Sequence, residues 1–137
     1  MTYTKGSYIL VTYLGKDLKI RIGKLGIIDF IKGYYCYVGS AFGKIVNLEN
    51  RIRRYKKLNR EKKGNLKWHI DYFLVSPNVS IKRVITFNKK IECEIAKIIE
   101  KNSNKTIFGF GSSDCKCKSH FYYFKSLRGL KRTLKSF

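Results

Sequence analysis

Gly6–Tyr13, with the sequence GSYILVTY, is a nearly continuous run of β-branched, aromatic and other apolar residues. Such a run is typical of a strand that is apolar on both faces. Gly33–Gly39 (GYYCYVG) is a second aromatic strand bracketed by glycines, and Leu18–Ile22 (LKIRI) alternates like a strand with one wet face. Because Gly15–Asp17 has turn chemistry, we expect Gly6–Tyr13 and Leu18–Ile22 to form a hairpin. Gly23–Lys32 is ambiguous, and one interpretation is a short extension of the same ribbon.

Helical spacing follows these strands. Leu48, Ile52 and Tyr55 fall at positions i, i+4 and i+7, and Asn47 is a suitable N-cap. The second half of the chain is expected to add a short helix over Trp68–Leu74, a strand over Val79–Phe87, a helix over Lys89–Lys101 with Ile91, Ile95, Ile98 and Ile99 inward, and a strand over Phe121–Phe124. The pattern predicts a mixed α/β (α+β) fold, a small sheet edged by helices. We expect a single domain over 1–137 with a short basic segment at about 125–137.

The charge balance is strongly basic. The chain carries 30 Lys and Arg against 9 Asp and Glu, a formal net charge of +21. Self-repulsion on this scale is relieved by a polyanionic partner, so DNA or RNA is the expected ligand. A generic basic protein and an anionic membrane surface are the alternatives.

The apolar pattern disfavours a membrane-spanning protein and a secreted protein. The apolar runs are too short to span a bilayer, and the first residues lack the apolar stretch of a signal peptide. We therefore expect a cytoplasmic protein without membrane attachment. Its four cysteines, Cys36, Cys93, Cys115 and Cys117, are expected to be reduced thiols that are either buried or metal-bound.

Four short elements occur in a characteristic order: Gly6-Ser7-Tyr8, Tyr37-Val38-Gly39, Arg51 and Glu92. Taken singly, each has an ordinary explanation as a core tyrosine, a solvated arginine or a helix-terminal acid. Together with the stretches 47–55 and 92–96, they resemble the GIY-YIG nuclease family. The stretches Trp68–Tyr72 and Gly111–His120 resemble a branch of that family found in archaea and bacteria, sometimes fused to endonuclease III-like proteins. The resemblance covers nearly the whole chain.

This resemblance implies a mostly antiparallel sheet flanked by helices and a DNA endonuclease activity, with a role in DNA repair and a repair-protein partner suggested by the fusions. Tyr8 would be the base or proton relay for the attacking water, and Tyr37 would hydrogen-bond at the same centre. Arg51 would hold the scissile phosphate, and Tyr55 matches a position that the family fills with tyrosine or histidine. One divalent ion, Mg²⁺ or Mn²⁺, would be bound by Glu92.

The sequence departs from the family pattern in several ways. The first motif is Gly-Ser-Tyr in place of Gly-Ile-Tyr, the second is Tyr-Val-Gly, and Asn102 and Asn104 are both candidates for a late asparagine that some members carry. Residues 14–32 look like an inserted hairpin and loop, and Ser40-Ala41-Phe42 replaces a lysine that several members carry, for which Lys44 is a candidate substitute. Cationic neighbours would have to lower the pKa of Tyr8 if it is to act as a base. Contacts to nucleic acid are expected from the basic residues Lys44, Arg53, Arg54, Lys56 and Lys57.

A cysteine–histidine cluster, Cys115-x-Cys117-x-x-His120, permits a second site. Thiolate and imidazole are suitable donors for zinc, with His69 or Cys93 as the fourth ligand. The spacing is tighter than that of a usual zinc knuckle, so a phosphate-facing loop and ordinary packing stay open as alternatives. At the level of function, the alternatives to the nuclease are a non-catalytic nucleic-acid-binding module and a zinc-stabilised adaptor that recruits a repair protein.

Overall fold

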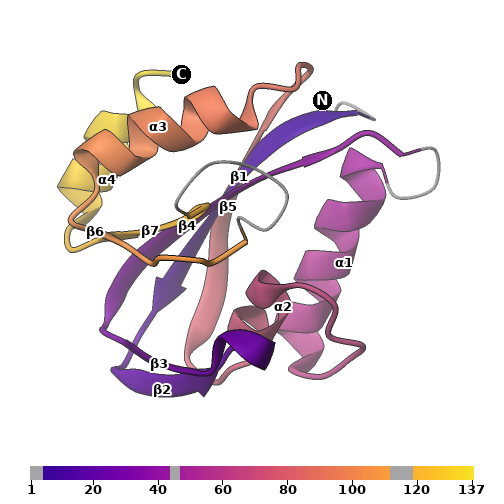
Figure 1. The fold of residues 1–137 in the computed structure, drawn as a ribbon, viewed down its shortest axis with the longest axis vertical. Helices are drawn as coiled ribbons and strands as arrows, with labels where there is room; N and C mark the ends of the chain where they lie inside the picture. Colours follow the sequence, from indigo (N-terminus) through magenta and orange to yellow (C-terminus); the bar gives the residue numbers. More distant parts are fainter. Residues whose placement is uncertain (1–4, 44–46, 112–118) are drawn as a thin grey trace.

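A computed structural model describes residues 5–43, 47–111 and 119–137. Its centre is a five-stranded antiparallel sheet with the order β5-β1-β4-β7-β6 (Figure 1). The strands are β1 (Gly6–Leu14), β4 (Gly33–Ala41), β5 (Val79–Phe87), β6 (Lys105–Thr106) and β7 (Phe121–Phe124). The α+β class is therefore confirmed, as are the expected strands at 6–13, 33–39, 79–87 and 121–124. The two-residue β6 was not predicted.

The expected hairpin between Gly6–Tyr13 and Leu18–Ile22 is wrong. Strand β1 is hydrogen-bonded to β4 along one edge and to β5 along the other, so no edge is left for a third partner. Instead β2 (Leu18–Arg21) pairs with β3 (Ile27–Phe30) in a separate two-stranded sheet, and the 3-10 helix η1 (Gly23–Leu25) connects them. The Asp17 carboxylate accepts a hydrogen bond of 2.7 Å from the Lys32 backbone N–H, which closes the base of this insertion. An inserted hairpin is thus present, but it begins after β1.

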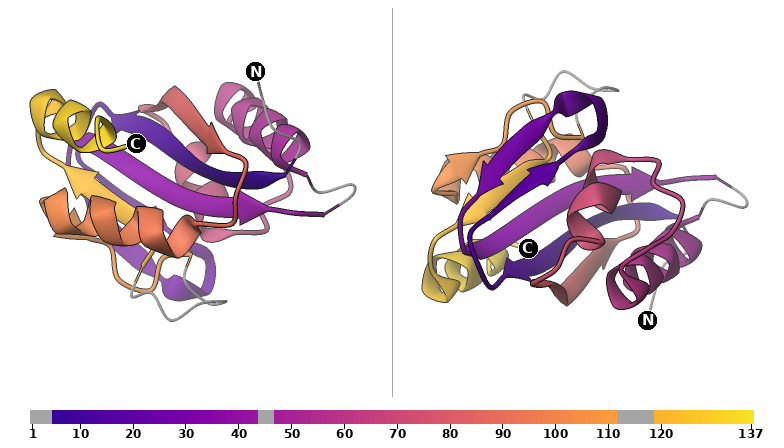
Figure 2. Two further views of the ribbon diagram at one scale, coloured as in Figure 1. Left: turned by 90° about the horizontal axis from the view of Figure 1, so that it is seen from above. Right: turned by 90° about the horizontal axis from the view of Figure 1, so that it is seen from below.

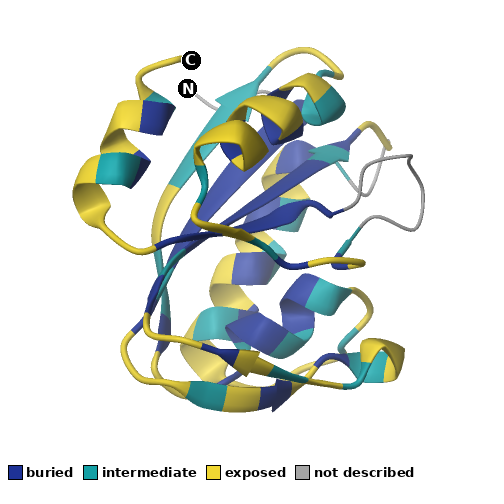
Figure 3. Ribbon diagram, turned by 60° about the vertical axis from the view of Figure 1, so that its left-hand side comes forward, coloured by how far each residue is buried: buried dark blue, intermediate teal, exposed yellow. Residues whose placement is uncertain are grey.

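Helices cover both faces of the large sheet. The first face carries α1 (Leu48–Glu61), α2 (His69–Leu74) and the β2–β3 hairpin, and the second carries α3 (Glu92–Asn102) and α4 (Leu127–Leu134) (Figures 1 and 2). Alternation along β1 supplies both layers, because Tyr8 and Leu10 belong to the first core and Ile9 and Val11 to the second. Figure 3 shows the buried strands between helices whose outer sides are exposed.

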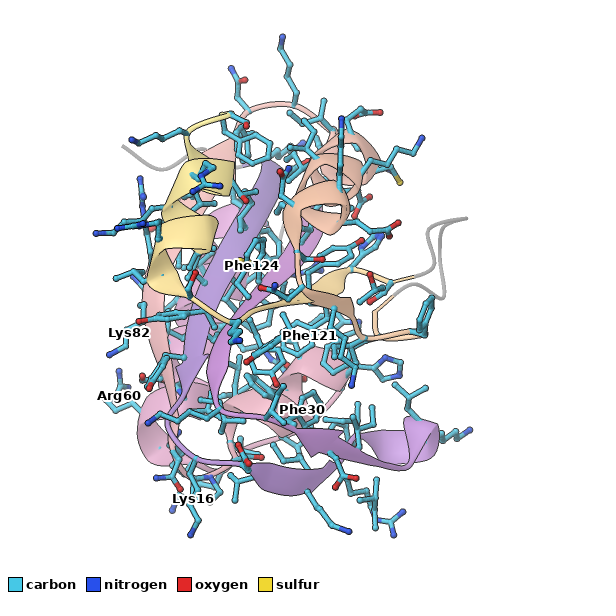
Figure 4. All side chains as sticks on the ribbon, turned by 90° about the vertical axis from the view of Figure 1, so that its left-hand side faces the viewer. Lys16, Phe30, Arg60, Lys82, Phe121 and Phe124 are labelled. Carbon is cyan, nitrogen blue, oxygen red and sulfur yellow. The ribbon has the colours of Figure 1, made fainter. Side chains whose placement is uncertain are left out.

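Aromatic rings fill the first core. Phe30 of the hairpin packs edge-on against Phe121 of β7 at 6.2 Å between ring centroids and against Phe73 of α2 at 5.1 Å. Figure 4 shows Phe30 of β3 and Phe121 of β7 directed toward each other. The hairpin is therefore anchored to the sheet by a side chain that is 1% exposed. This anchor holds the inserted segment against α2, which it also contacts through β2 and η1.

Two details of the second face differ from expectation. Ile98 is 37% exposed, and the buried face of α3 is made by Ile95, Ala96 and Ile99. Ala96 fits because its small side chain lies on the sheet-facing side, whereas Ile98 lies on the flank of the helix. The basic C-terminal segment forms α4, which was not predicted; its Leu130 and Thr133 pack inward. None of the helices in the described ranges combines the length and the apolar character needed to cross a bilayer.

Candidate active site

A cavity of about 190 Å³ opens where β1, β4, α1 and the start of α2 meet. It is polar, and it brings together residues that are far apart in the sequence. Its lining consists of Tyr8, Tyr37, Gly39, Ser40, Arg51, Tyr55, Lys67, Trp68, His69 and Gly111. All four residues expected to be catalytic, from β1, β4 and α1, are in this set.

Strand pairing places the Tyr8 hydroxyl. Tyr8 of β1 lies opposite Gly39 of β4, and a Cβ at position 39 would overlap the Tyr8 hydroxyl. The glycine of the Tyr37-Val38-Gly39 motif is therefore needed so that the Tyr8 side chain can cross the neighbouring strand. The Tyr8 hydroxyl then lies 2.7 Å from the hydroxyl of Tyr55, and both side chains are 1% exposed.

Arg51 enters the cavity from α1, one turn before Tyr55. This helix begins at Leu48 because the Asn47 side chain accepts a hydrogen bond of 2.9 Å from the Asn50 N–H, as predicted. The Arg51 guanidinium donates from Nη1 to the Ser40 carbonyl at 2.7 Å and lies 4.5 Å from the centre of the Trp68 ring. Its Nε is buried and has no hydrogen-bond partner among the residues that the structure describes.

Glu92 reaches the same region from α3, on the other face of the sheet. Its Oε1 accepts a hydrogen bond of 3.0 Å from the Ser40 hydroxyl. Ser40 thus contacts both Glu92, through its side chain, and Arg51, through its carbonyl. Sequence reasoning noted Ser40 only as the replacement for a lysine, and no local pattern marks a serine as such a link.

The donor set fits one hard divalent cation. In the described ranges no three His, Cys, Asp or Glu side chains lie close enough together to hold a metal. Mg²⁺ does not require such a cluster, since it is often bound through one or two carboxylates, several waters and substrate phosphate oxygens. Glu92 supplies one half-buried carboxylate of this kind next to Ser40.

Burial determines the protonation of the three tyrosines. It raises the pKa of Tyr8, and this effect exceeds the opposing effects of the Tyr55 hydrogen bond and the Arg51 charge. Burial also raises the pKa of Tyr37 and of Tyr55 well above the ordinary value. The expectation that cationic side chains lower the pKa of Tyr8 is therefore not met by the described residues. All three phenols are neutral near pH 7.

A buried carboxylate positions the start of α2. Asp71 is fully buried and accepts hydrogen bonds from the backbone N–H groups of Lys67 and Trp68 at 2.7 and 2.9 Å. It also accepts two hydrogen bonds from Arg54, at 2.9 and 2.7 Å. Arg54, expected to contact nucleic acid, is thus engaged in a structural ion pair that joins α1 to α2. This pair places Trp68 and His69 at the cavity, a role that sequence reasoning did not assign to them.

The expected zinc ligands are only partly described. Cys115 and Cys117 lie outside the described residues, and Cys93 is a half-buried thiol on α3. Nδ1 of His69 accepts a hydrogen bond of 2.9 Å from the Gly111 N–H, and Nδ1 of the buried His120 lies 3.1 Å from the Val38 carbonyl oxygen. Each imidazole therefore has one nitrogen in a structural hydrogen bond.

The other expected contacts lie on the outer face of α1. Arg53, Lys56 and Lys57 are exposed around a shallow groove together with Arg60. Arg53 forms an exposed ion pair with Glu49 at 2.9 Å. Lys44 lies outside the described residues. A second set of exposed cations, which sequence reasoning assigned only to a basic segment, lies on α4: Arg128, Lys131, Arg132 and Lys135.

Comparison with known proteins gives one assignment. The chain has no significant match among curated proteins or among solved structures. Residues 7–137 match the family described as "Domain of unknown function DUF123", which includes every residue of the cavity. The chain therefore belongs to the DUF123 family.

Proposed function

We propose that this protein is a metal-dependent DNA endonuclease of the GIY-YIG type, which hydrolyses phosphodiester bonds. The observation that carries the proposal is the position of Arg51, which lines a cavity together with three tyrosines and whose buried Nε has no hydrogen-bond partner among the described residues. A desolvated charged donor left unsatisfied costs roughly 1–3 kcal/mol or more. A phosphate bound in the cavity would be a suitable acceptor for the Arg51 guanidinium, because guanidinium–phosphate hydrogen bonds are strong and directional.

Each side chain has a distinct role in this proposal. Arg51 binds the scissile phosphate and stabilises the negative charge that develops on it. The neutral Tyr8 hydroxyl, hydrogen-bonded to Tyr55, is placed to orient the attacking water. Glu92 would hold one Mg²⁺ or Mn²⁺, which when bound supplies Lewis-acid chemistry at the phosphate. Ser40 fixes the positions of the Glu92 carboxylate and the Arg51 guanidinium relative to each other, because it is hydrogen-bonded to both.

The charge of the surface supports a nucleic-acid substrate. The net charge of +21 is spread over exposed cations on several elements, including Lys16, Arg60 and Lys82, which project outward in Figure 4. Neutralising phosphates with such side chains releases counterions and favours binding. The outer face of α1 presents Arg53 and Lys57 to a nucleic-acid backbone, and Arg51 of the same helix lines the cavity.

A second candidate is a non-catalytic nucleic-acid-binding module on the same scaffold. It is favoured by the raised pKa of Tyr8, because no phenolate is present near pH 7 without a further cation. This candidate predicts salt-sensitive binding to DNA or RNA without a requirement for metal.

One experiment separates the two candidates. Labelled single-stranded, duplex, flapped and four-way DNAs, with RNA in parallel, are incubated with Mg²⁺ or Mn²⁺ and the wild type, Glu92→Gln or Glu94→Gln. Glu94 is an exposed acid in the same first turn of α3, so Glu94→Gln is the matched control. We expect cleavage by the wild type and the control but not by Glu92→Gln, with DNA affinity unchanged. Binding by all three without cleavage of any substrate would support the non-catalytic module.

A further inference from the structure

His69 lines the cavity and is held there by two contacts. It is the first residue of α2, its ring packs edge-on against Phe110 at 5.5 Å between centroids, and its Nδ1 accepts from the Gly111 N–H. Gly111 lies between His69 and Tyr37, because a Cβ there would be 2.8 Å from the Tyr37 ring. Its φ of +68° is in the left-handed region that favours glycine. The backbone thus brings the imidazole next to Tyr37.

The Gly111 hydrogen bond determines the tautomer of His69. An N–H group can donate only to an unprotonated ring nitrogen, so Nδ1 carries no hydrogen. The neutral ring must then carry its hydrogen on Nε2. Partial burial lowers the pKa of His69, which favours this neutral form near pH 7. Nε2 forms no hydrogen bond to the residues that the structure describes, although the ring lines the cavity.

We propose that His69 is a further catalytic residue, whose Nε2–H donates a hydrogen bond to an oxygen of the scissile phosphate. The inference rests on the proposed function and names a second donor, in the same cavity as Arg51, for the same group. The surroundings suit this role, because the Arg51 guanidinium lies over the ring of Trp68, the residue next to His69, so both donors are near the start of α2. A neutral donor of this kind stabilises charge as it develops on the phosphate without bringing a second cation into the cavity.

A zinc ion is the other ligand that Nε2 could bind. The positive charges of Arg51 and Lys67, which line the same cavity, disfavour a bare dication at this nitrogen and favour an anion. Phosphate is therefore the ligand for which the surroundings of His69 are suited, and zinc binding is an outcome that the experiment can reveal.

Two amide substitutions separate donation from positioning. In His69→Asn the side-chain oxygen can take the place of Nδ1 and keep the Gly111 hydrogen bond, but nothing reaches the place of Nε2. In His69→Gln the amide nitrogen reaches the place of Nε2 and can donate. We expect His69→Asn to lower kcat about 10- to 100-fold with little change in KM, as removal of a charge-stabilising donor does. We expect His69→Gln to retain most of the wild-type kcat.

Equal rates for His69→Asn, His69→Gln and the wild type would overturn the proposal. An equal loss in both variants would also overturn it, since it would assign His69 a positioning role. Thermal unfolding of each variant verifies that the compared proteins are folded.

A measurement without catalysis keeps this inference separate from the proposed function. Long-range ¹H–¹⁵N NMR of the wild type reports the tautomer of His69 and its response to inorganic phosphate. A protonated Nε2 whose shift moves with phosphate, and moves less in Arg51→Ala, supports the phosphate contact even if no DNA is cleaved. A protonated Nδ1, a shift unaffected by phosphate, or a shift that responds to stoichiometric zinc would overturn it.

Discussion

The ion pair between Asp71 and Arg54 should be a major source of stability, and Asp71→Ala tests this. Asp71 is fully buried and accepts four hydrogen bonds: two from the guanidinium and two from backbone N–H groups at the start of α2. The substitution leaves Arg54, whose side chain is 27% exposed, without its acid and two backbone donors without an acceptor. Removing one partner of a buried pair costs about 3–5 kcal/mol. We expect a loss of that size in the free energy of unfolding.

The single tryptophan makes the assay local as well as global. Trp68 is the N-cap residue of α2 and lies over both Arg51 and Arg54, so its fluorescence reports the region that Asp71 organises. Urea unfolding followed by Trp68 fluorescence and by circular dichroism gives the free energy, and a double-mutant cycle with Arg54→Ala isolates the pair. Glu49→Ala is the control, because it removes an exposed i,i+4 pair worth roughly 0.3–0.5 kcal/mol. A loss for Asp71→Ala below about 1 kcal/mol would refute the reasoning.

Three further predictions concern other parts of the molecule. Gly39→Ala should displace the Tyr8 hydroxyl and cost roughly 2–4 kcal/mol in urea unfolding, while Gly15→Ala, whose Cβ meets only ordinary van der Waals neighbours, should be nearly neutral; equal costs would contradict the packing account. Tyr8, Tyr37 and Tyr55 have raised pKa values when folded, so their contribution to stability is present below about pH 10 and is lost as the pH rises above it. The free energy of unfolding should then fall by roughly 1 kcal/mol per pH unit for each phenol, and Tyr55→Phe should make this dependence on pH shallower. An unchanged dependence on pH would show that folding does not raise the pKa of Tyr55. Replacing the four exposed cations at α4 by glutamine should make the plot of log K against log salt less steep. The steepness should fall by about 0.9 for each DNA phosphate that is no longer neutralised, measured by DNA binding at several salt concentrations. An identical slope would remove α4 from the nucleic-acid surface.

Local patterns predicted most of the elements of this fold. The aromatic and β-branched composition of β1, β4, β5 and β7 is sufficient to identify strands, and the apolar spacing of α1 behind its Asn47 cap identifies a helix. Strand pairing could not be predicted in the same way. Adjacent segments with a turn between them normally form a hairpin, but β1 is an inner strand of the sheet and both of its edges are paired with strands from later in the chain.

The candidate site was predictable where a motif carried it. The order of Tyr8, Tyr37, Arg51 and Glu92 in the sequence suggested a common site, and the structure brings the first three into one cavity with Glu92 linked through Ser40. The link itself depends on a side chain and a carbonyl of the same residue, which no spacing rule predicts.

The placement of the basic residues was predictable only in part. Arg53 and Arg54 are neighbours in the sequence with the same charge, yet one is exposed and the other is paired with Asp71 on a different helix. Helical geometry separates them by about 100°, but the partner that engages Arg54 comes from the tertiary fold. The contribution of His69 to the cavity depends on the same fold, because the Asp71 pair determines where α2 begins.

In the proposed function, Arg51 acts on the scissile phosphate and not as one more surface cation. Single-turnover cleavage rates and DNA dissociation constants of Arg51→Ala and Arg53→Ala, measured on the best-cleaved substrate, test this most directly. Both arginines lie on α1, but only Arg51 lines the cavity, and Arg53 is exposed. The account predicts a loss of about 10²-fold or more in rate for Arg51→Ala with a small change in affinity, and a change in affinity alone for Arg53→Ala. Cleavage by Arg51→Ala at the wild-type rate, or the same modest loss of affinity in both variants, would contradict it.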